Sequence, residues 1–443
     1  MFFKNLWSFQ YKKNPEKADY QSYSSSEKAY TPVSQLVIGM YIVELDRPWL
    51  ETPFLFQGFE LKTEAQIKSV KNFCNYVYID KTKTKTIKRV ISENQAQSQS
   101  KILNNIDTSE IPLKKTGSFE HEISQADNIY TNAEQLMANF MTTAAKGAGV
   151  DGWLAKKAVT DCVSSVLKSP DAMLWLTQLK NKDKYTLQHS LNVCILAIVF
   201  GRYLNVSKEN LVNLGLCGML HDIGKMRIPL RILNKRSQLE NEELEILKTH
   251  TTLGYELLKS SDCMDPCVAE TALTHHECLD GSGYPRGLKQ GSISDFAKII
   301  SIVDAYDSMT SDKIYQKGKT HLEAIHAMMT MAGYAWDKKL VIKFIECLGV
   351  YPPGSPVVMT NGSLGVVIEV NDKMKLRPKV ILLMDEEKQP LPEQVIDLSE
   401  MICDNHGNTF TIKNIINAEE WNIDINKYYR DGFIQKSFAR NLN

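Results

Sequence analysis

Residues 211–222 read LVNLGLCGMLHD, a nearly unbroken apolar run that ends in a histidine and an aspartate. Apolar residues at almost every position predict a helix inside the core of a domain rather than on its surface. His221 and Asp222 stand where such a core helix would finish. An unpaired buried carboxylate is destabilising by several kcal/mol. The Asp222 carboxylate therefore needs a positively charged partner.

Further histidines and one further aspartate occupy similar positions along the chain. His189 and His250 lie at helical spacing from apolar residues, and Asp304 follows a largely apolar run, so all three side chains are expected to point inward. The apolar companions are Val193, Leu196 and Phe200 for His189, Leu244 and Leu247 for His250, and residues 299–303 for Asp304.

These side chains together favour a metal centre. Taken singly, each is adequately explained as a hydrogen-bonded core residue, and that alternative stays open. A shared site accounts for all seven at once: His189, His221, Asp222, His250, His275, His276 and Asp304. Imidazole and carboxylate ligands suit Fe, Mn, Co, Ni or Zn. Five imidazoles and two carboxylates are too many for one ion, so we expect two ions, with Asp222 as the bridge.

Residues 274–287, THHECLDGSGYPRG, place two adjacent histidines before a glycine-rich loop. Both rings can reach one metal only near a helix end, where the backbone can adjust. Glycines at 281, 283 and 287 allow the backbone to come close to a ligand or partner. A simple helix-terminating turn is the alternative reading of the loop alone.

The spacing of apolar residues predicts a mainly helical protein with a small α+β domain before the helices and a β-rich part after them. Residues 33–80 combine expected short strands around Val37, Met40 and Ile42, a helix over 63–73 and a strand over 76–79. We expect a small α+β N-terminal domain with a regulatory role at 33–80, a linker at 81–118, a helical catalytic domain at 121–349, a β-rich extension at 350–417 and a polar tail at 418–443. Helices are predicted near 121–145, 152–168, 171–180, 185–203, 207–220, 239–259, 264–275, 295–311 and 321–348.

Composition narrows the possible partners. The 443 residues carry a formal net charge of zero, which gives no general reason to bind duplex nucleic acid. No apolar run approaches the roughly 18 residues of a membrane span, and the first 20 residues make a poor signal peptide. The nine cysteines are dispersed without a CxxC pair, as expected for reduced thiols in the cytoplasm. The sequence leaves the oligomeric state open.

The motifs HDIGK at 221–225 and HHECLDGSGYP at 275–285 resemble the HD-GYP family of HD-domain phosphohydrolases. The same order and spacing hold upstream and downstream: Tyr185-Thr186 with His189-Ser190, His250 with Gly254, and Asp304-Ala305-Tyr306-Asp307. The resemblance covers about residues 180–350 and, with YPPGS and GSLGVV, extends to about 400. Residues 33–80 look like the short domain of unknown function that often precedes such modules.

The resemblance implies hydrolysis of cyclic di-GMP to pGpG, with a further step to GMP left open, and so a lower level of this bacterial second messenger. It implies a binuclear or trinuclear centre of transition metals, with iron or manganese first and nickel, cobalt or zinc as alternatives. One ion would be held by His189, His221, Asp222 and Asp304. The other would be held by Asp222, His250, His275 and His276.

The resemblance also implies roles around the metals. Lys225 would lie near the scissile phosphate and act in catalysis with Asp222. The GYP loop, Gly283-Tyr284-Pro285, would flank the substrate and contact GGDEF-type protein partners. Lys313 and Lys317 are further candidates for binding substrate phosphate.

Two positions depart from the family pattern. Members with three metals carry a glutamate where this chain has Tyr185, and tyrosine is a weaker ligand, so two ions are expected. An Arg-Pro-Tyr-Arg-like run is replaced by residues 313–316, KIYQ. Lysine keeps the positive charge but lacks the bidentate fork of arginine, so the grip on phosphate is expected to differ, and Lys317 or Lys319 could compensate.

Two other functions stay open from the sequence. An HD-type site could act on another cyclic dinucleotide or on a nucleotide. A regulatory module could bind ligand and act through partner contacts, for which the altered run at 313–316 is the one supporting feature.

Overall fold

The computed structural model describes residues 28–47, 52, 54, 58–80, 83, 115–179, 185–235, 237–312, 317–404, 407–418, 421 and 423–432. The chain forms two compact units, and the smaller contains the N-terminal sheet. Most of the predicted linker and residues 313–316 lie outside the described ranges. None of the helices in these ranges is both long enough and apolar enough to cross a membrane.

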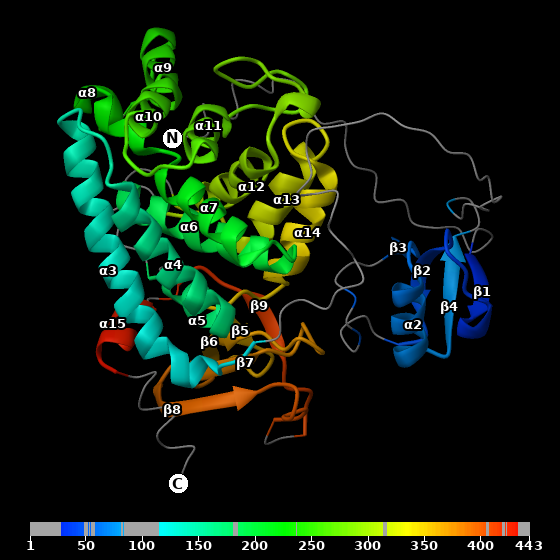
Figure 1. The fold of residues 1–443 in the computed structure, drawn as a ribbon. Helices are drawn as coiled ribbons and strands as arrows, with labels where there is room; N and C mark the ends of the chain where they lie inside the picture. The colour runs from blue at the N-terminus through cyan, green and yellow to red at the C-terminus, as the bar shows by residue number, and fades with distance from the viewer. Residues whose placement is uncertain are drawn as a thin grey trace, which may run out of the picture. The chain divides into compact units, whose positions relative to one another are not determined.

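In its described residues the N-terminal unit contains a four-stranded antiparallel sheet and one α-helix (Figure 1). Its core lies between that helix and the sheet, where Ile67 and Val70 of α2 meet Ile42 of β2 and Val77 of β4. Thr63 caps α2 with a capping box. The elements are β1 (Lys28–Pro32), β2 (Tyr41–Leu45), β3 (Phe59–Glu60), α2 (Glu64–Phe73) and β4 (Tyr76–Asp80), in the sheet order β1-β4-β2-β3.

The predicted helix and second strand of this unit are confirmed, but part of the first strand prediction was wrong. Ile42 lies in β2, whereas Val37 and Met40 precede the strand. Val37 is exposed. An apolar residue in a turn satisfies the same short pattern as an inward-facing strand residue.

The second unit is built around α6 and α7. All residues from His189 to Arg202 in α6 are buried, so this helix has no solvent face and lies in the centre of the helical body. Figure 1 shows α6 and α7 surrounded by the other helices. The helices are α3 (Phe119–Ala145), α4 (Gly152–Lys168), α5 (Pro170–Leu176), α6 (Tyr185–Tyr203), α7 (Lys208–Leu220), α8 (Leu230–Leu233), α9 (Asn241–Lys248), α10 (His250–Lys259), α11 (Pro266–Thr274), α12 (Asp295–Thr310), α13 (His321–Met331), α14 (Lys338–Leu348) and α15 (Ile425–Arg430), with a short 3-10 helix η5 (Ile223–Arg227) after α7.

Two helices predicted as continuous are each divided. In 239–259 the break falls at Thr249, whose N–H donates to the carbonyl of Ile246, three residues back instead of four. In 321–348 the break contains Gly333, with a φ of 94°, and Asp337 then caps the next helix. The first break is functionally relevant, since it makes His250 the first residue of α10.

The C-terminal part of this unit is an antiparallel sheet, as predicted. Leu364, Val366 and Ile368 of β6 join the helical core, whereas Val367 faces a second apolar cluster within the sheet. This alternation is expected for a strand buried on both faces. The strands are β5 (Pro356–Met359), β6 (Leu364–Glu369), β7 (Lys379–Met384), β8 (Pro390–Asp397) and β9 (Ile412–Ile415), in the order β8-β7-β6-β5-β9.

The mainly helical fold class with a small N-terminal α+β part and a C-terminal β part is confirmed. The segment predicted as a polar tail differs in character, because it contains α15. The ring of Tyr429 in α15 lies 5.1 Å from that of Trp175 in α5, centroid to centroid. The boundaries assigned to the domains stay predictions.

Candidate metal centre

The structure brings the seven predicted ligands together at one place in the helical unit. Each is buried, with at most 4% of its surface exposed. Five of the seven lie at helix ends, where the backbone leaves the regular helix and neighbouring rings can converge. His189 and Asp304 lie within α6 and α12, His221 follows α7, Asp222 precedes η5, His250 begins α10, and His275 and His276 follow α11.

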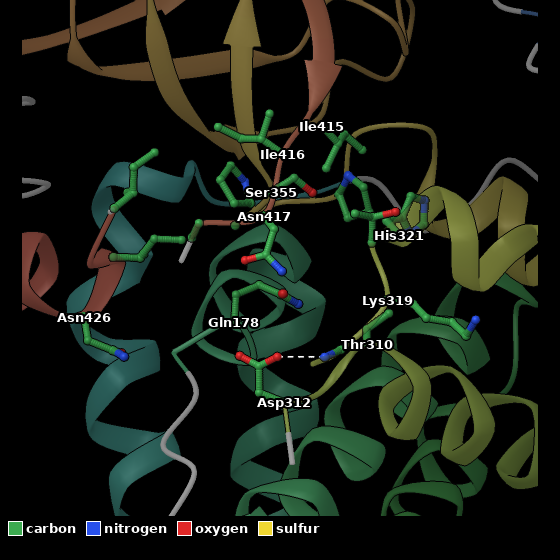
Figure 2. Close-up of a pocket in the computed structure, with 18 of the residues that line it drawn as sticks. Gln178, Thr310, Asp312, Lys319, His321, Ser355, Ile415, Ile416, Asn417 and Asn426 are labelled. Atoms are coloured by element: carbon green, nitrogen blue, oxygen red, sulfur yellow. Dashed lines mark hydrogen bonds between the residues drawn. The ribbon is translucent and has the colours of Figure 1, made fainter. Parts of the chain in front are cut away.

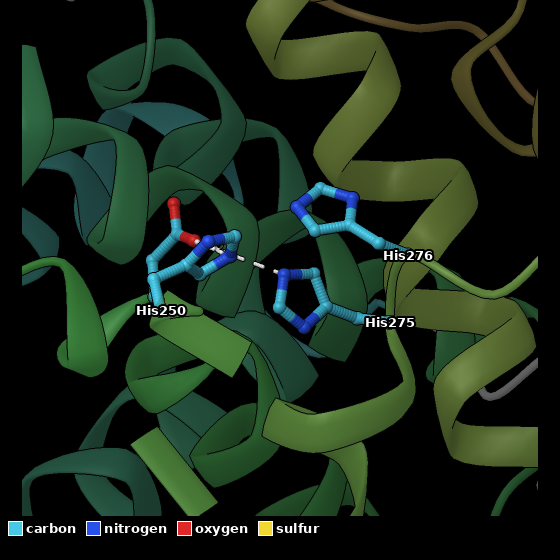
Figure 3. A group of neighbouring side chains, drawn as sticks. His250, His275 and His276 are labelled. Atoms are coloured by element: carbon cyan, nitrogen blue, oxygen red, sulfur yellow. Dashed lines mark ion pairs between the residues drawn. The ribbon is translucent and has the colours of Figure 1, made fainter. Parts of the chain in front are cut away.

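The seven side chains form two groups of ligand atoms. His189, His221 and Asp304 make one, and the other contains His250, His275 and His276 together with Asp222; within each group the ligand atoms lie within 4.8 Å of one another. Figure 3 shows the rings of His275 and His276 beside each other, with His250 facing them.

Asp222 stands between the two groups. Its Oδ2 atom lies 3.3 Å from His221 Nε2 and 3.7 Å from His189 Nε2. Its Oδ1 atom lies 3.3 Å from His250 Nε2 and 3.7 Å from His275 Nε2. Each oxygen therefore faces a different set of imidazoles, which is the arrangement required of a bridging carboxylate.

Hydrogen bonds fix the imidazoles with Nε2 toward this centre. The Nδ1 atoms of His221, His250 and His275 lie 2.8–2.9 Å from backbone carbonyl oxygens, which can only accept, so Nδ1 carries the proton. In the neutral ring Nε2 then has a free lone pair.

The hydrogen bonding of these inward-facing atoms shows whether the residues fit a metal ion. Among the residues that the structure describes, no partner forms a hydrogen bond of acceptable geometry with Nε2 of His221, His250 or His275, or with Oδ1 of Asp222. Buried polar atoms are rarely left in this state. Nε2 of His189 lies 3.0 Å from Oδ1 of Asp304, so these two atoms form an ion pair in the metal-free protein. Nitrogen lone pairs and carboxylate oxygens converging in a buried place match the ligand set of a transition-metal site, so the residues fit the predicted ions.

The electrostatics differ between the two groups. Burial lowers the pKa of His250 to about 3 and also lowers the pKa values of His275 and His276, which keeps these rings neutral. Burial alone would also lower the pKa of His189, but the carboxylates of Asp304 and Asp307 outweigh it and raise the pKa to about 9. The metal-free His189 ring is therefore protonated at neutral pH.

Lys225 lies beside the bridging carboxylate. It is in η5, three residues after Asp222, and its Nζ atom pairs with Asp222 Oδ2. Burial tends to raise the pKa of Asp222, yet the charge of Lys225, together with the adjacent His221 ring, holds it well below its usual range. The predicted proximity of Lys225 to the centre is thus present in the structure.

The GYP loop is folded back onto the centre rather than extended away from it. The Tyr284 ring, 9% exposed, stacks on the His276 ring with the centroids 4.8 Å apart. The buried carboxylate of Glu277 accepts hydrogen bonds from the backbone N–H groups of Arg286 and Leu288. Pro285 is exposed. The role of Glu277 was missed from the sequence, although its place beside His276 was a possible signal.

The structure gives less information on the remaining residues singled out from the sequence. Tyr185 stacks on His189, with centroids 5.7 Å apart and ring planes 9° apart. Lys317 is exposed, and Lys313 lies in the segment 313–316, outside the described residues. Substrate contacts of both lysines stay predictions.

A separate cavity of about 560 Å³ lies between the helical body and the C-terminal sheet (Figure 2). Gln178, Asp312, His321 and Asn417 are among its lining residues, and none of the seven predicted ligands is. The chemistry assigned to the seven ligands therefore does not take place in this cavity.

Family comparisons agree with this geometry. The HD domain family matches residues 174–340, a domain of unknown function, DUF3391, matches 30–152, and a KOW domain associated with HD domains matches 356–421. Over 394 residues the chain is 34% identical to a cyclic di-GMP phosphodiesterase of Pseudomonas aeruginosa, covering 88% of this chain and 92% of that protein. The chain belongs to the HD-GYP family.

Two further relatives of this HD-GYP protein are informative. A cyclic di-GMP phosphodiesterase of Borreliella burgdorferi is 30% identical over 251 residues, 56% of this chain and 64% of that protein. A 3′3′-cGAMP-specific phosphodiesterase of Vibrio cholerae is 34% identical over 157 residues, 35% of this chain and 36% of that protein. In this HD-GYP chain the match to the domain of unknown function extends through α3, beyond the range 33–80 expected for the N-terminal domain.

Proposed function

We propose that this HD-GYP protein is a phosphodiesterase that hydrolyses cyclic di-GMP to pGpG, with GMP as the product of a second hydrolysis. The observation that carries the proposal is the position of Asp222 between two groups of histidines, of which His221, His250 and His275 have Nε2 atoms without a hydrogen-bond partner among the described residues. The relative that matches nearly the whole chain is named as a cyclic di-GMP phosphodiesterase, which supports the substrate.

The residues present would hold two divalent transition ions. His189, His221 and Asp304 would bind one, His250, His275 and His276 the other, and Asp222 both. Iron or manganese is proposed first, with nickel, cobalt or zinc as alternatives, since the ligands are nitrogen and oxygen only. When bound, such ions supply a water molecule that ionises near neutral pH and positive charge that polarises the phosphoryl group.

The chain's own residues would orient the phosphodiester and stabilise its charge. Lys225, beside Asp222, would place its ammonium against a phosphoryl oxygen, where charge builds up as the bond to the ribose 3′-oxygen breaks. The GYP loop, Gly283-Tyr284-Pro285, would border the substrate, with Pro285 exposed and the Tyr284 ring behind it. Lys313 and Lys317 would contact the second phosphate.

A product assay tests the proposal. Protein purified anaerobically is loaded with Mn(II) or Fe(II) and incubated with cyclic di-GMP, and the nucleotides are separated by chromatography. The proposal expects pGpG first, and no product from a His221→Ala variant under the same conditions. Metal-loaded wild-type protein that leaves cyclic di-GMP intact would refute it.

A second candidate substrate is another cyclic dinucleotide. The similarity to a 3′3′-cGAMP-specific enzyme favours including this compound. With both substrates in one reaction, the ratio of the two kcat/KM values decides the preference. We propose a preference for cyclic di-GMP, and a larger kcat/KM for 3′3′-cGAMP would assign the chain to the second class.

The cellular setting is part of the same proposal. The nine cysteines are all free thiols, as expected for a reducing cytoplasm. GGDEF-type partners would bind at the GYP loop, Gly283-Tyr284-Pro285, of which Pro285 is exposed. A regulatory role through such contacts, without hydrolysis, would appear as partner binding by a protein that is inactive in the product assay.

A further inference from the structure

His189 is held differently from the three other histidines whose Nδ1 bonds are described above. In His221, His250 and His275, Nδ1 bonds to a backbone carbonyl three residues earlier in the chain. In His189, Nδ1 lies 2.8 Å from Oδ2 of Asp307, a side chain 118 residues away on α12. One ligand histidine thus depends on a carboxylate where the others depend on the local backbone.

Asp307 does not belong to either group of ligand atoms. It faces Nδ1 of His189, whereas the ligand groups contain the Nε2 side of the ring. Its carboxylate is 2% exposed, and it also accepts hydrogen bonds from Asn192 Nδ2 and Ser311 Oγ, each at 3.2 Å. A buried carboxylate is destabilising unless it is satisfied in this way.

Asn192 connects Asp307 to another helix. It lies three residues after His189 on α6, so both side chains share a helical face. Its Oδ1 atom accepts a hydrogen bond from the Tyr130 hydroxyl at 3.2 Å, and its amide also donates to the carbonyl of Thr177. Tyr130 is on α3, so three buried side chains link α3 to a ligand ring.

A carboxylate bonded to a ligand histidine has two consequences. It fixes the tautomer and the orientation of the ring, and it makes the ligand nitrogen more basic than a backbone carbonyl does. Loss of such a partner typically weakens metal binding about 10–100-fold. A purely architectural network would instead affect the stability of the whole domain.

We propose that Asp307 is a positioning residue for the metal position formed by His189, His221 and Asp304, and that Asn192 and Tyr130 hold Asp307 in place. This inference rests on the proposed function only in requiring that the centre binds ions. It assigns the two metal positions different supports: the Asp307 network for one, and backbone carbonyls for His250 and His275 at the other.

Metal binding to an Asp307→Asn variant tests this inference. His189 and Asn192 bond to different oxygens of Asp307, and asparagine replaces one of these oxygens with an NH2 group that cannot accept. The matched control is Asp295→Asn, which changes another buried aspartate of α12, paired with Lys298. Co(II) is titrated into metal-free protein in the presence of a competing chelator, which gives the affinity of each of the two positions. The visible spectrum of bound Co(II) reports the coordination at each position.

The expected result is selective. One Co(II) position should weaken about 10–100-fold in Asp307→Asn with a changed spectrum, while the second position keeps its affinity. Asp295→Asn should bind both ions as the wild type does. Equal affinities in Asp307→Asn and wild type, or an equal weakening of both positions, would overturn the inference.

Tyr130→Phe decides the matter if Asp307→Asn does not fold. This variant removes one hydroxyl and should weaken the same single position by about 2–5-fold, the equivalent of one hydrogen bond. No change at either position would contradict the network. A wild-type protein that binds no ion would overturn both the proposed function and this inference, whereas two tight ions in every variant would overturn this inference alone.

Discussion

The ring of Tyr284 covers the ring of His276, with centroids 4.8 Å apart and planes inclined by 29°. The tyrosine of the GYP motif therefore packs directly against a ligand histidine. It also belongs to an apolar cluster with Ile228, Ile232 and Leu247. The motif is thus part of the wall of the metal centre as well as an exposed loop.

Replacing this ring should affect both stability and metal binding. Tyr284→Ala should lower the free energy of unfolding by about 3–5 kcal/mol, because it leaves a cavity in the cluster and removes support from His276. Tyr284→Phe keeps the ring and serves as the control, with near wild-type metal content. Denaturant unfolding and metal analysis check both, and an Ala variant as stable and as metal-rich as the Phe variant would contradict the packing role.

Gly283→Ala should be destabilising for steric reasons. A Cβ atom at this position would lie 2.3 Å from the backbone N of Cys278 and 2.5 Å from Cα of Glu277. The loop must shift, which costs about 1–3 kcal/mol. Gly291→Ala is the matched control, since a Cβ there meets nothing within 4 Å. Thermal melts of the two variants should differ, and equal melting temperatures would show that the loop adjusts freely.

Lys225→Ala should separate catalysis from metal binding. The loss of the ammonium removes charge stabilisation in the transition state, so kcat should fall about 10²–10³-fold while two ions remain bound. Lys298→Ala is a close control, because both lysines have 12% side-chain exposure and pair with an aspartate three residues earlier. If Lys225→Ala loses metal in parallel with activity, the lysine is needed to hold the metal site together and the catalytic role is contradicted.

Metal binding should release a proton from His189 at neutral pH. The pKa of about 9 means that the ring carries both protons in the metal-free protein, and the Nε2 proton must leave when an ion binds. Affinity should therefore rise with pH, by about tenfold per unit between 7 and 9, and level off above. Calorimetry with Mn(II) in buffers of different ionisation enthalpy measures the release, and a buffer-independent heat would contradict it.

The raised pKa of His189 also predicts how the stability of the metal-free protein changes with pH. Because the folded-state pKa of His189 lies above the ordinary value of 6.5, protonation stabilises the folded metal-free protein most fully below pH 6.5. This contribution should be lost as pH rises through about 9. Denaturant midpoints of the metal-free protein over this range provide the check, and the metal-loaded protein should lack this dependence.

Much of the centre could be predicted because its residues interrupt apolar patterns. His221 and Asp222 end a core helix, and Asp304 sits inside one, so burial followed from local periodicity. The helical body and the C-terminal sheet followed from the same signals. The bridging position of Asp222 was inferred by counting ligands, and the structure places its two oxygens toward different imidazoles.

Other features depend on contacts that no local pattern carries. The bond between Asp307 and His189 joins α12 to α6, and Asn192 looks like any polar residue on a helix. The inward packing of Tyr284 and the hydrogen bonds from the loop backbone to Glu277 are contacts that a glycine-rich sequence does not suggest. The break between α9 and α10 at Thr249 is a change in backbone hydrogen bonding within a segment whose apolar pattern is continuously helical.

The metal content of anaerobically purified protein, compared with that of Asp222→Asn, tests the central claim most directly. The account predicts two transition ions per wild-type chain and at most one in the variant, because asparagine offers a single acceptor oxygen between the two groups of histidines. Wild-type protein without tightly bound transition metal, or a variant that still holds two ions as firmly, would contradict it.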